Sequence, residues 1–103
     1  MSMPRTQLQQ ELEDILGSKN VYFQRPGTTQ MTYPSIVYKL ENKKDNRANN
    51  KRYLTYNQYE IEVISPKSTN TIADQILDHF DHSSFDRRFV SDNLYHDVVT
   101  LYF

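Results

Sequence analysis

The segment Asp78-His79-Phe80-Asp81-His82 places two histidines three residues apart, with two carboxylates beside them. Imidazole and carboxylate groups together can hold zinc or another transition metal. The spacing differs from the HExxH pattern of zinc proteases, and the segment falls at the end of a predicted helix, where the helix dipole favours histidine. We therefore interpret the segment as a helix end and predict neither a metal site nor a cofactor.

Catalytic chemistry finds no support elsewhere in the chain. The 103 residues include no cysteine, which excludes disulfides, thiol catalysis and thiolate zinc sites. Only two glycines are present, and the sequence holds neither a Gly-x-Ser-x-Gly turn that would present a serine nor a glycine-rich phosphate loop. We predict that the protein is not an enzyme.

Composition predicts one small folded domain that spans residues 1–103. Leu, Ile, Val and Phe number 25 and the net charge is only −1, so the chain should fold. The core is thin, because eight of the apolar residues are tyrosines, a residue type that is common at protein interfaces. The pI of about 6.3 argues against a basic face for duplex DNA. No apolar run suggests a membrane span or a signal core.

A long β-hairpin over residues 33–65 organises the rest of the chain. In its second strand Tyr59, Ile61 and Val63 alternate with polar residues, which is the period of a half-buried strand. The first strand, 35–40, is β-branched and aromatic. Between the two strands we predict a long polar loop at 41–52.

This loop carries a local charge of +3, because five basic residues oppose Glu41 and Asp45. It could be a solvated tip, a contact arm in an assembly, or a surface that faces nucleic acid, with Tyr53 and Tyr56 able to stack on bases. The candidate assembly residues are Lys43, Lys44, Arg47, Lys51 and Arg52.

The remaining elements complete the hairpin. Helices are predicted at 4–16, ending at Gly17, and at 71–80, capped by Asn70 or Thr69. A short strand at 21–25 precedes the hairpin. A second hairpin runs from 85 to 103, with Phe85 and Phe89 expected on one face, and its last strand, bulky on both faces, is expected to be central or at an interface. The order α-β-β-β-α-β-β predicts an α+β fold: a mostly antiparallel sheet with two helices on one face.

In the order of these elements and motifs, the chain resembles the small tail-completion proteins of long-tailed bacteriophages. The likeness covers nearly the whole chain and follows the order of its motifs: YPSIVYKL, a long polar hairpin loop, YLTYNQYEIEVIS, and the closing segment SFDRRFVSDNLYHDVVTLYF, whose last strand finishes the protein. It is strongest to tail terminators at the head–tail junction. The resemblance implies a ring, usually a hexamer, that ends the tail tube and docks it to the head.

Several further expectations follow from this likeness. The ring would lie in the virion, after assembly in the host cytoplasm, and would contact the tail tube protein and head-completion or connector proteins. DNA would pass through its channel without specific binding. The 41–52 loop would be the reaching arm, and the inter-subunit surface would include Tyr38, Tyr53, Tyr56 and Tyr102. Two other functions stay open: another head–tail junction component, and a single-stranded nucleic-acid-binding protein that uses the basic loop.

Overall fold

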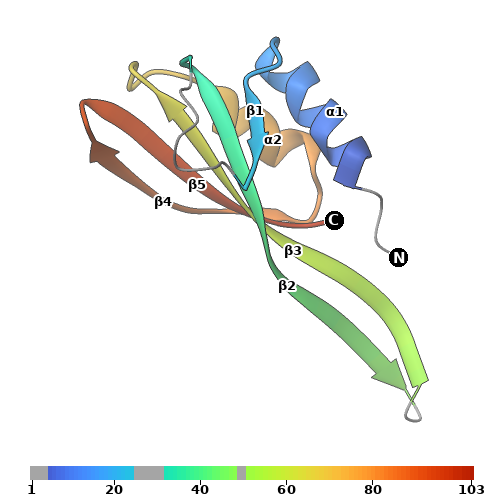
Figure 1. Cartoon of the computed structure of the whole chain (residues 1–103). Coiled ribbons are helices and arrows are strands. Elements are labelled where there is room, and N and C mark those ends of the chain that lie inside the picture. The colour runs from blue at the N-terminus through green and yellow to red at the C-terminus, as the bar shows by residue number, and fades with distance from the viewer. Residues whose placement is uncertain (1–4, 25–31, 49–50) are drawn as a thin grey trace.

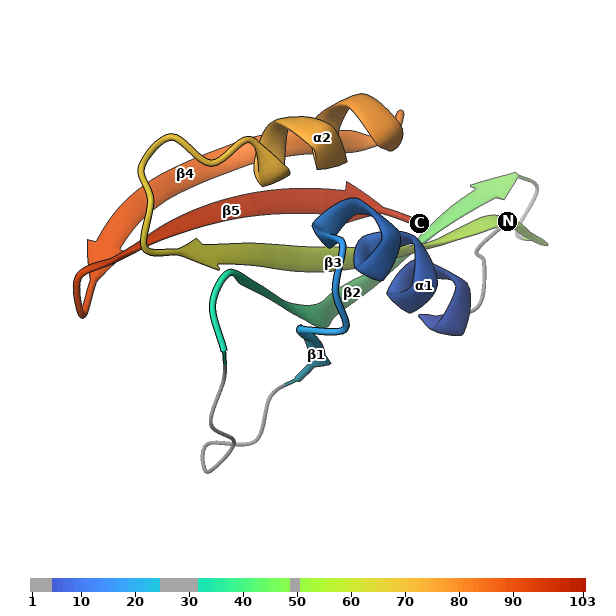
Figure 2. The same ribbon diagram turned by 90° about the horizontal axis from the view of Figure 1, so that it is seen from above.

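The computed structural model describes residues 5–24, 32–48 and 51–103, and it describes their side chains except at 42–56. These residues form an α+β domain in which two helices cover one face of a five-stranded mixed sheet (Figures 1 and 2). The predicted fold class and order of elements are confirmed. The elements are α1 (Arg5–Leu16), β1 (Val21–Phe23), β2 (Ser35–Ala48), β3 (Lys51–Ser65), α2 (Ile72–His79), β4 (Ser83–Ser91) and β5 (Leu94–Tyr102).

The strands lie in the order β1-β2-β3-β5-β4. β1 runs parallel to β2, and the other three pairings are antiparallel. β5 therefore lies between β3 and β4, which confirms the prediction that its two bulky faces belong to an internal strand. β1 and β4 form the edges of the sheet, and β4 is exposed along nearly its whole length.

The core lies between the helices and one face of the sheet. Pairing places Ile36 opposite Val63, and Ile61 lies between Tyr38 and Val99, so one face of the three central strands is continuously apolar. Burial of this face supplies the main driving force for folding. The helices contribute buried residues to the same cluster: Leu8 and Leu12 from α1, and Ala73 and Ile76 from α2.

The predicted end of α1 and the predicted start of α2 both have the expected capping residues. Gly17 ends α1 with a positive φ of 82°, and its N–H donates to the Glu13 carbonyl at 2.8 Å. At the start of α2, the Asn70 side-chain oxygen accepts a hydrogen bond from the Ile72 N–H at 3.3 Å. Asn70 supplies this oxygen from the position before Thr71, whose own side chain makes no cap bond.

The predicted 41–52 loop is wrong, because most of it is strand. β2 continues to Ala48 and β3 begins at Lys51, with register shifts between Leu40 and Asn42 and between Asn46 and Arg47. A two-stranded ladder satisfies the backbone hydrogen bonds even where water covers both faces, so it needs no apolar period. We call residues 42–48 and 51–56 the ribbon. It projects from the body of the domain (Figure 1), and the whole molecule measures 50 Å along its longest axis.

The second hairpin also differs from its prediction in one respect. A register shift between Phe85 and Arg87 marks a β-bulge in β4. Phe85 therefore lies on the helix side, near Ala73, whereas Phe89 lies on the opposite face and stacks on His96. The expectation that the two phenylalanines share a face is wrong. The turn of this hairpin has positive φ at Asp92 and Asn93, as in the type I′ turns that suit twisted hairpins.

Candidate functional site: the open sheet face and the ribbon

The five predicted assembly residues all lie in the ribbon. Its backbone pairs Lys44 with Tyr56 and Arg47 with Arg52. The ribbon contains five basic residues and one acidic residue, Asp45, which gives it a net charge of +4. Since the whole chain has a net charge of −1, the remainder has −5. Positive charge is therefore concentrated in the projecting part of the molecule, at Lys43, Lys44, Arg47, Lys51 and Arg52.

The predicted tyrosine surface is not one surface. Tyr38 is fully buried in the core, where its hydroxyl donates to Gln9 at 2.6 Å and accepts from Arg5 at 3.3 Å. Its assignment to an inter-subunit surface is wrong, because the helices already cover it. Tyr102 is 37% exposed, at the end of β5. The side chains of Tyr53 and Tyr56 lie outside the described residues.

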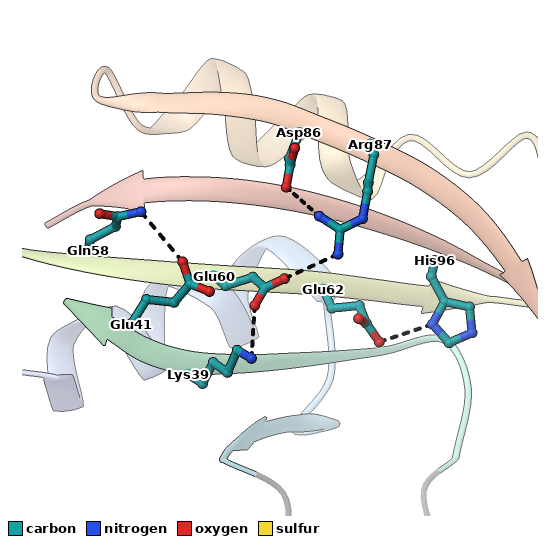
Figure 3. A network of polar contacts seen from close by, with 8 residues as sticks. All are labelled: Lys39, Glu41, Gln58, Glu60, Glu62, Asp86, Arg87 and His96. Carbon is teal, nitrogen blue, oxygen red and sulfur yellow. Dashed lines mark hydrogen bonds and ion pairs between the residues drawn. The ribbon is translucent and has the colours of Figure 1, made fainter.

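The sheet face opposite the helices, which we call the open face, carries a network of charged side chains (Figure 3). Glu60 lies at its centre, 3.1 Å from Lys39 and 3.7 Å from Arg87. Arg87 also contacts Asp86 at 2.5 Å. The hydrogen bond to Glu60 raises the pKa of the Lys39 ammonium group, so Lys39 stays charged. These contacts link β2, β3 and β4 across the face and span β5, which lies between β3 and β4.

Carboxylates outnumber cations at one end of this network. Glu41 points towards Glu60, and the hydrogen bond between the two carboxyl groups raises the pKa of Glu41. A neutral donor, the Gln58 amide, lies 3.5 Å from Glu41 (Figure 3). Desolvation and the charge of Glu60 raise the pKa of Glu41 further, whereas the charge of Lys39 lowers it.

A histidine lies at the other end of the network. Nδ1 of His96 is 3.0 Å from Glu62, and the ring stacks on Phe89 with centroids 4.6 Å apart. The side chain is only 13% exposed, and its buried Nε2 has no hydrogen-bond partner among the described residues. A buried ring nitrogen without a hydrogen bond is costly, so a polar group that reached Nε2 would stabilise this arrangement.

Three adjoining hollows run along β2 on the open face and share Lys39; together we call them the groove. Their volumes are about 650, 410 and 320 Å³. The largest reaches from Lys39 to Asp92 at the β4–β5 turn, and the second reaches the root of the ribbon at Glu41. Two cations, Lys39 and Arg87, line the groove or its rim against five carboxylates: Glu41, Glu60, Glu62, Asp86 and Asp92.

Sequence reasoning placed Glu60 and Glu62 on a polar strand face but missed the groove. Their partners come from other strands, 21 to 34 residues away in the sequence for Lys39 and His96. The bulge in β4 decides that Arg87 rather than Arg88 reaches this face. No local signal in the sequence fixes that pairing.

The helix side holds further polar contacts that connect elements of the fold. Arg88 binds the buried Asp97 with two hydrogen bonds and donates a third to the Ser68 carbonyl. His79, from the segment considered for metal binding, lies 2.7 Å from Glu11 and joins α2 to α1. Among the described residues no group of three or more His, Asp or Glu could hold a metal ion. Within the same ranges, no helix is long and apolar enough to cross a membrane.

No protein-family model, curated protein or solved structure matches this chain. Its function is therefore inferred from its surfaces and from the order of its sequence motifs.

Proposed function

We propose that this chain is a structural subunit of a long-tailed phage, one of about six copies in a ring that terminates the tail tube and docks it to the head. The assignment to a phage rests on the order of the sequence motifs. The observation that best supports an assembly role is the ribbon, which projects from the domain and carries a net charge of +4. We propose no catalytic step and no cofactor for this protein.

In an isolated domain the ribbon would contribute little to the free energy of folding. A two-stranded hairpin is at best marginally stable in water, because it has neither a third strand nor a helix to pack against. Contact with a partner would order the ribbon and bury part of it, so that assembly would stabilise the subunit. Such a contact joins unlike surfaces, and unlike surfaces close into a ring when the rotation between copies permits.

The same ribbon would serve a different head–tail junction component, such as a head-completion or connector protein. A connector-type subunit would order its ribbon on the neighbouring protein rather than on its own copies. In either case the protein would act in the virion after assembly in the host cytoplasm, and DNA would pass without specific binding. Binding to isolated tail tubes distinguishes a terminator from a head-side component.

A second candidate of another class is single-stranded nucleic-acid binding. The net charge of +4 on a projecting ribbon with Tyr53 and Tyr56 favours it, since a basic surface with aromatic rings binds unpaired bases. Such binding would fall steeply with salt, with a slope of about 0.7 for each phosphate that the protein neutralises. The acidic remainder of the chain opposes a broad nucleic-acid surface.

The first experiment is light scattering across a range of protein concentrations, with electron microscopy of the same samples. Closed rings of uniform size are the expected result, either alone or on added tail tubes. A chain that stays monomeric at all concentrations, and that binds no tail tubes, would overturn the proposed function. In that case a salt-sensitive complex with single-stranded DNA would select the second candidate.

A further inference from the structure

We propose that the ribbon of one copy docks into the groove on the open sheet face of the next copy. This inference rests on the proposed function in assembly and identifies the surface that receives the projecting arm. The partner is a second copy of this chain, and the contact joins two different surfaces, one from each copy.

Charge complementarity favours this pairing. The ribbon has a net charge of +4, whereas the groove and its rim carry five carboxylates and two cations, a net charge of −3. The two cations are already engaged, because Lys39 and Arg87 both contact Glu60. Glu41 and Asp92, at opposite ends of the groove, have no ion pair among the described contacts. Basic side chains of an incoming ribbon would neutralise charge at both ends.

Two groups in the groove have environments that an incoming polar chain would improve. The Glu41 carboxyl lies beside the Glu60 carboxyl, and this contact raises the pKa of Glu41 more than the nearby Lys39 lowers it. His96 presents a buried Nε2 for which no described residue supplies a hydrogen bond. These two groups come from different strands and lie in different hollows, so they are independent observations on one surface.

The ribbon of a given copy cannot easily reach the groove of the same copy. Glu41 and Gln58 lie at the root of the ribbon and also line one hollow of the groove. From this root the ribbon runs away from the body of the domain, as Figure 1 shows. A ribbon that reaches the groove must therefore come from another copy. Because each copy offers one ribbon and one groove, the contact repeats head to tail and closes into a ring or continues as a filament.

Disulfide trapping tests the contact directly, since the chain has no native cysteine. One preparation carries Ala48→Cys at the tip of β2, and a second carries Val37→Cys on the floor of the groove. We expect mild oxidation of the mixture to give a cross-linked dimer of the two variants, and high salt to reduce its yield. The matched control replaces Val37→Cys by Gln10→Cys, which lies exposed on α1. A yield no higher than this control would overturn the proposal.

A charge exchange provides the second readout. Lys43→Glu with Lys44→Glu in the ribbon, or Glu41→Lys with Asp92→Lys in the groove, should each lower the trapping yield at least about fivefold, because like charges then meet. Combining all four changes in one chain should restore it. Equal losses in the combined variant, with folding intact by circular dichroism, would contradict the proposed pairing of surfaces.

The outcomes separate this inference from the proposed function. Rings in the microscope without cross-links above the control would leave the ring in place and overturn the docking site. Cross-links between copies that form no ring and bind no tail tube would support the docking site and overturn the tail-terminator role. Loss of single-stranded DNA binding on the two ribbon changes, without trapping, would assign the ribbon to nucleic acid instead.

Discussion

At the scale of single residues, two adjacent arginines have opposite surroundings. Arg88 binds Asp97, which is 2% exposed, whereas Arg87 lies on the open face and is half exposed. We expect Arg88→Ala to lower the free energy of unfolding by about 2–3 kcal/mol, because a buried carboxylate loses its partner. Arg87→Ala should cost less than about 1 kcal/mol. Urea unfolding of the two variants checks this, and equal losses would contradict it.

Tyr38 and Tyr59 predict how stability changes at alkaline pH. Burial raises the pKa of both hydroxyls above the ordinary value of about 10. The unfolded chain then ionises first as the pH rises, so the stability present below about pH 10 is lost above it. Tyr38→Phe should lose its hydrogen bonds, about 1 kcal/mol at pH 8, yet show a shallower decline from pH 9 to 11 in urea unfolding. If the stability of Tyr38→Phe declined as steeply as that of the unchanged protein, ionisation of Tyr38 would not be the cause.

Tyr38 also shows where residue chemistry misleads. A tyrosine in a strand suits both a core and an interface, since it has an apolar ring and a polar tip. The choice is made by Gln9 and Arg5 on α1, whose side chains meet the hydroxyl. They lie 29 and 33 residues away in the sequence, and no local sequence pattern predicts the contact.

At the scale of elements, the start of α2 gives a test with its own control. The Asn70 side chain accepts from the Ile72 N–H and donates to the Lys67 carbonyl. We expect Asn70→Ala to lower stability by about 1 kcal/mol, a typical loss for a helix cap. Thr71→Ala should change stability less, because Thr71 makes no side-chain bond to the backbone of the helix. Thermal unfolding of both variants measures the two losses. A larger loss for Thr71→Ala than for Asn70→Ala would contradict the assignment of Asn70 as the cap.

The ribbon should act in assembly and not in folding. Changing Lys43, Lys44 and Arg47 together to Ser should leave the unfolding midpoint unchanged but weaken ring formation or docking to tails, because it removes three charges from a projecting element. Ile61→Asp is the contrasting variant, since it buries an unpaired charge in the core and should unfold the domain. Infectious particles formed normally by the triple variant would remove the ribbon from assembly.

Helices and strands with one buried face were predictable, whereas the ribbon was not. Tyr59, Ile61 and Val63 alternate because one side of β3 meets the core. Beyond Leu40 that requirement ends, and a polar sequence without alternation is compatible with either a loop or a solvated ribbon. The bulge in β4 escaped prediction for a related reason: its sequence tolerates both registers, and packing against α2 and His96 selects one.

At the scale of the whole molecule, self-association should depend on salt. The proposed contact joins a ribbon of +4 to a groove of −3, and exposed charges are screened over about 8 Å at physiological ionic strength. We expect the midpoint concentration for assembly, measured by light scattering, to rise several-fold between 50 and 500 mM NaCl. Assembly that strengthens with salt would indicate an apolar interface instead, for example the exposed β4 edge with Phe85 and Val90.

The separation of charge along the molecule also has a kinetic consequence. A molecule 50 Å long with a net charge of +4 on its ribbon and −5 on the remainder is an electric dipole. Two such molecules turn each other head to tail while still apart, so a larger share of collisions begins in a productive orientation. Subunits could then be added quickly even when each contact is weak, and the order of addition would be set by diffusion in a field before any side chain is desolvated.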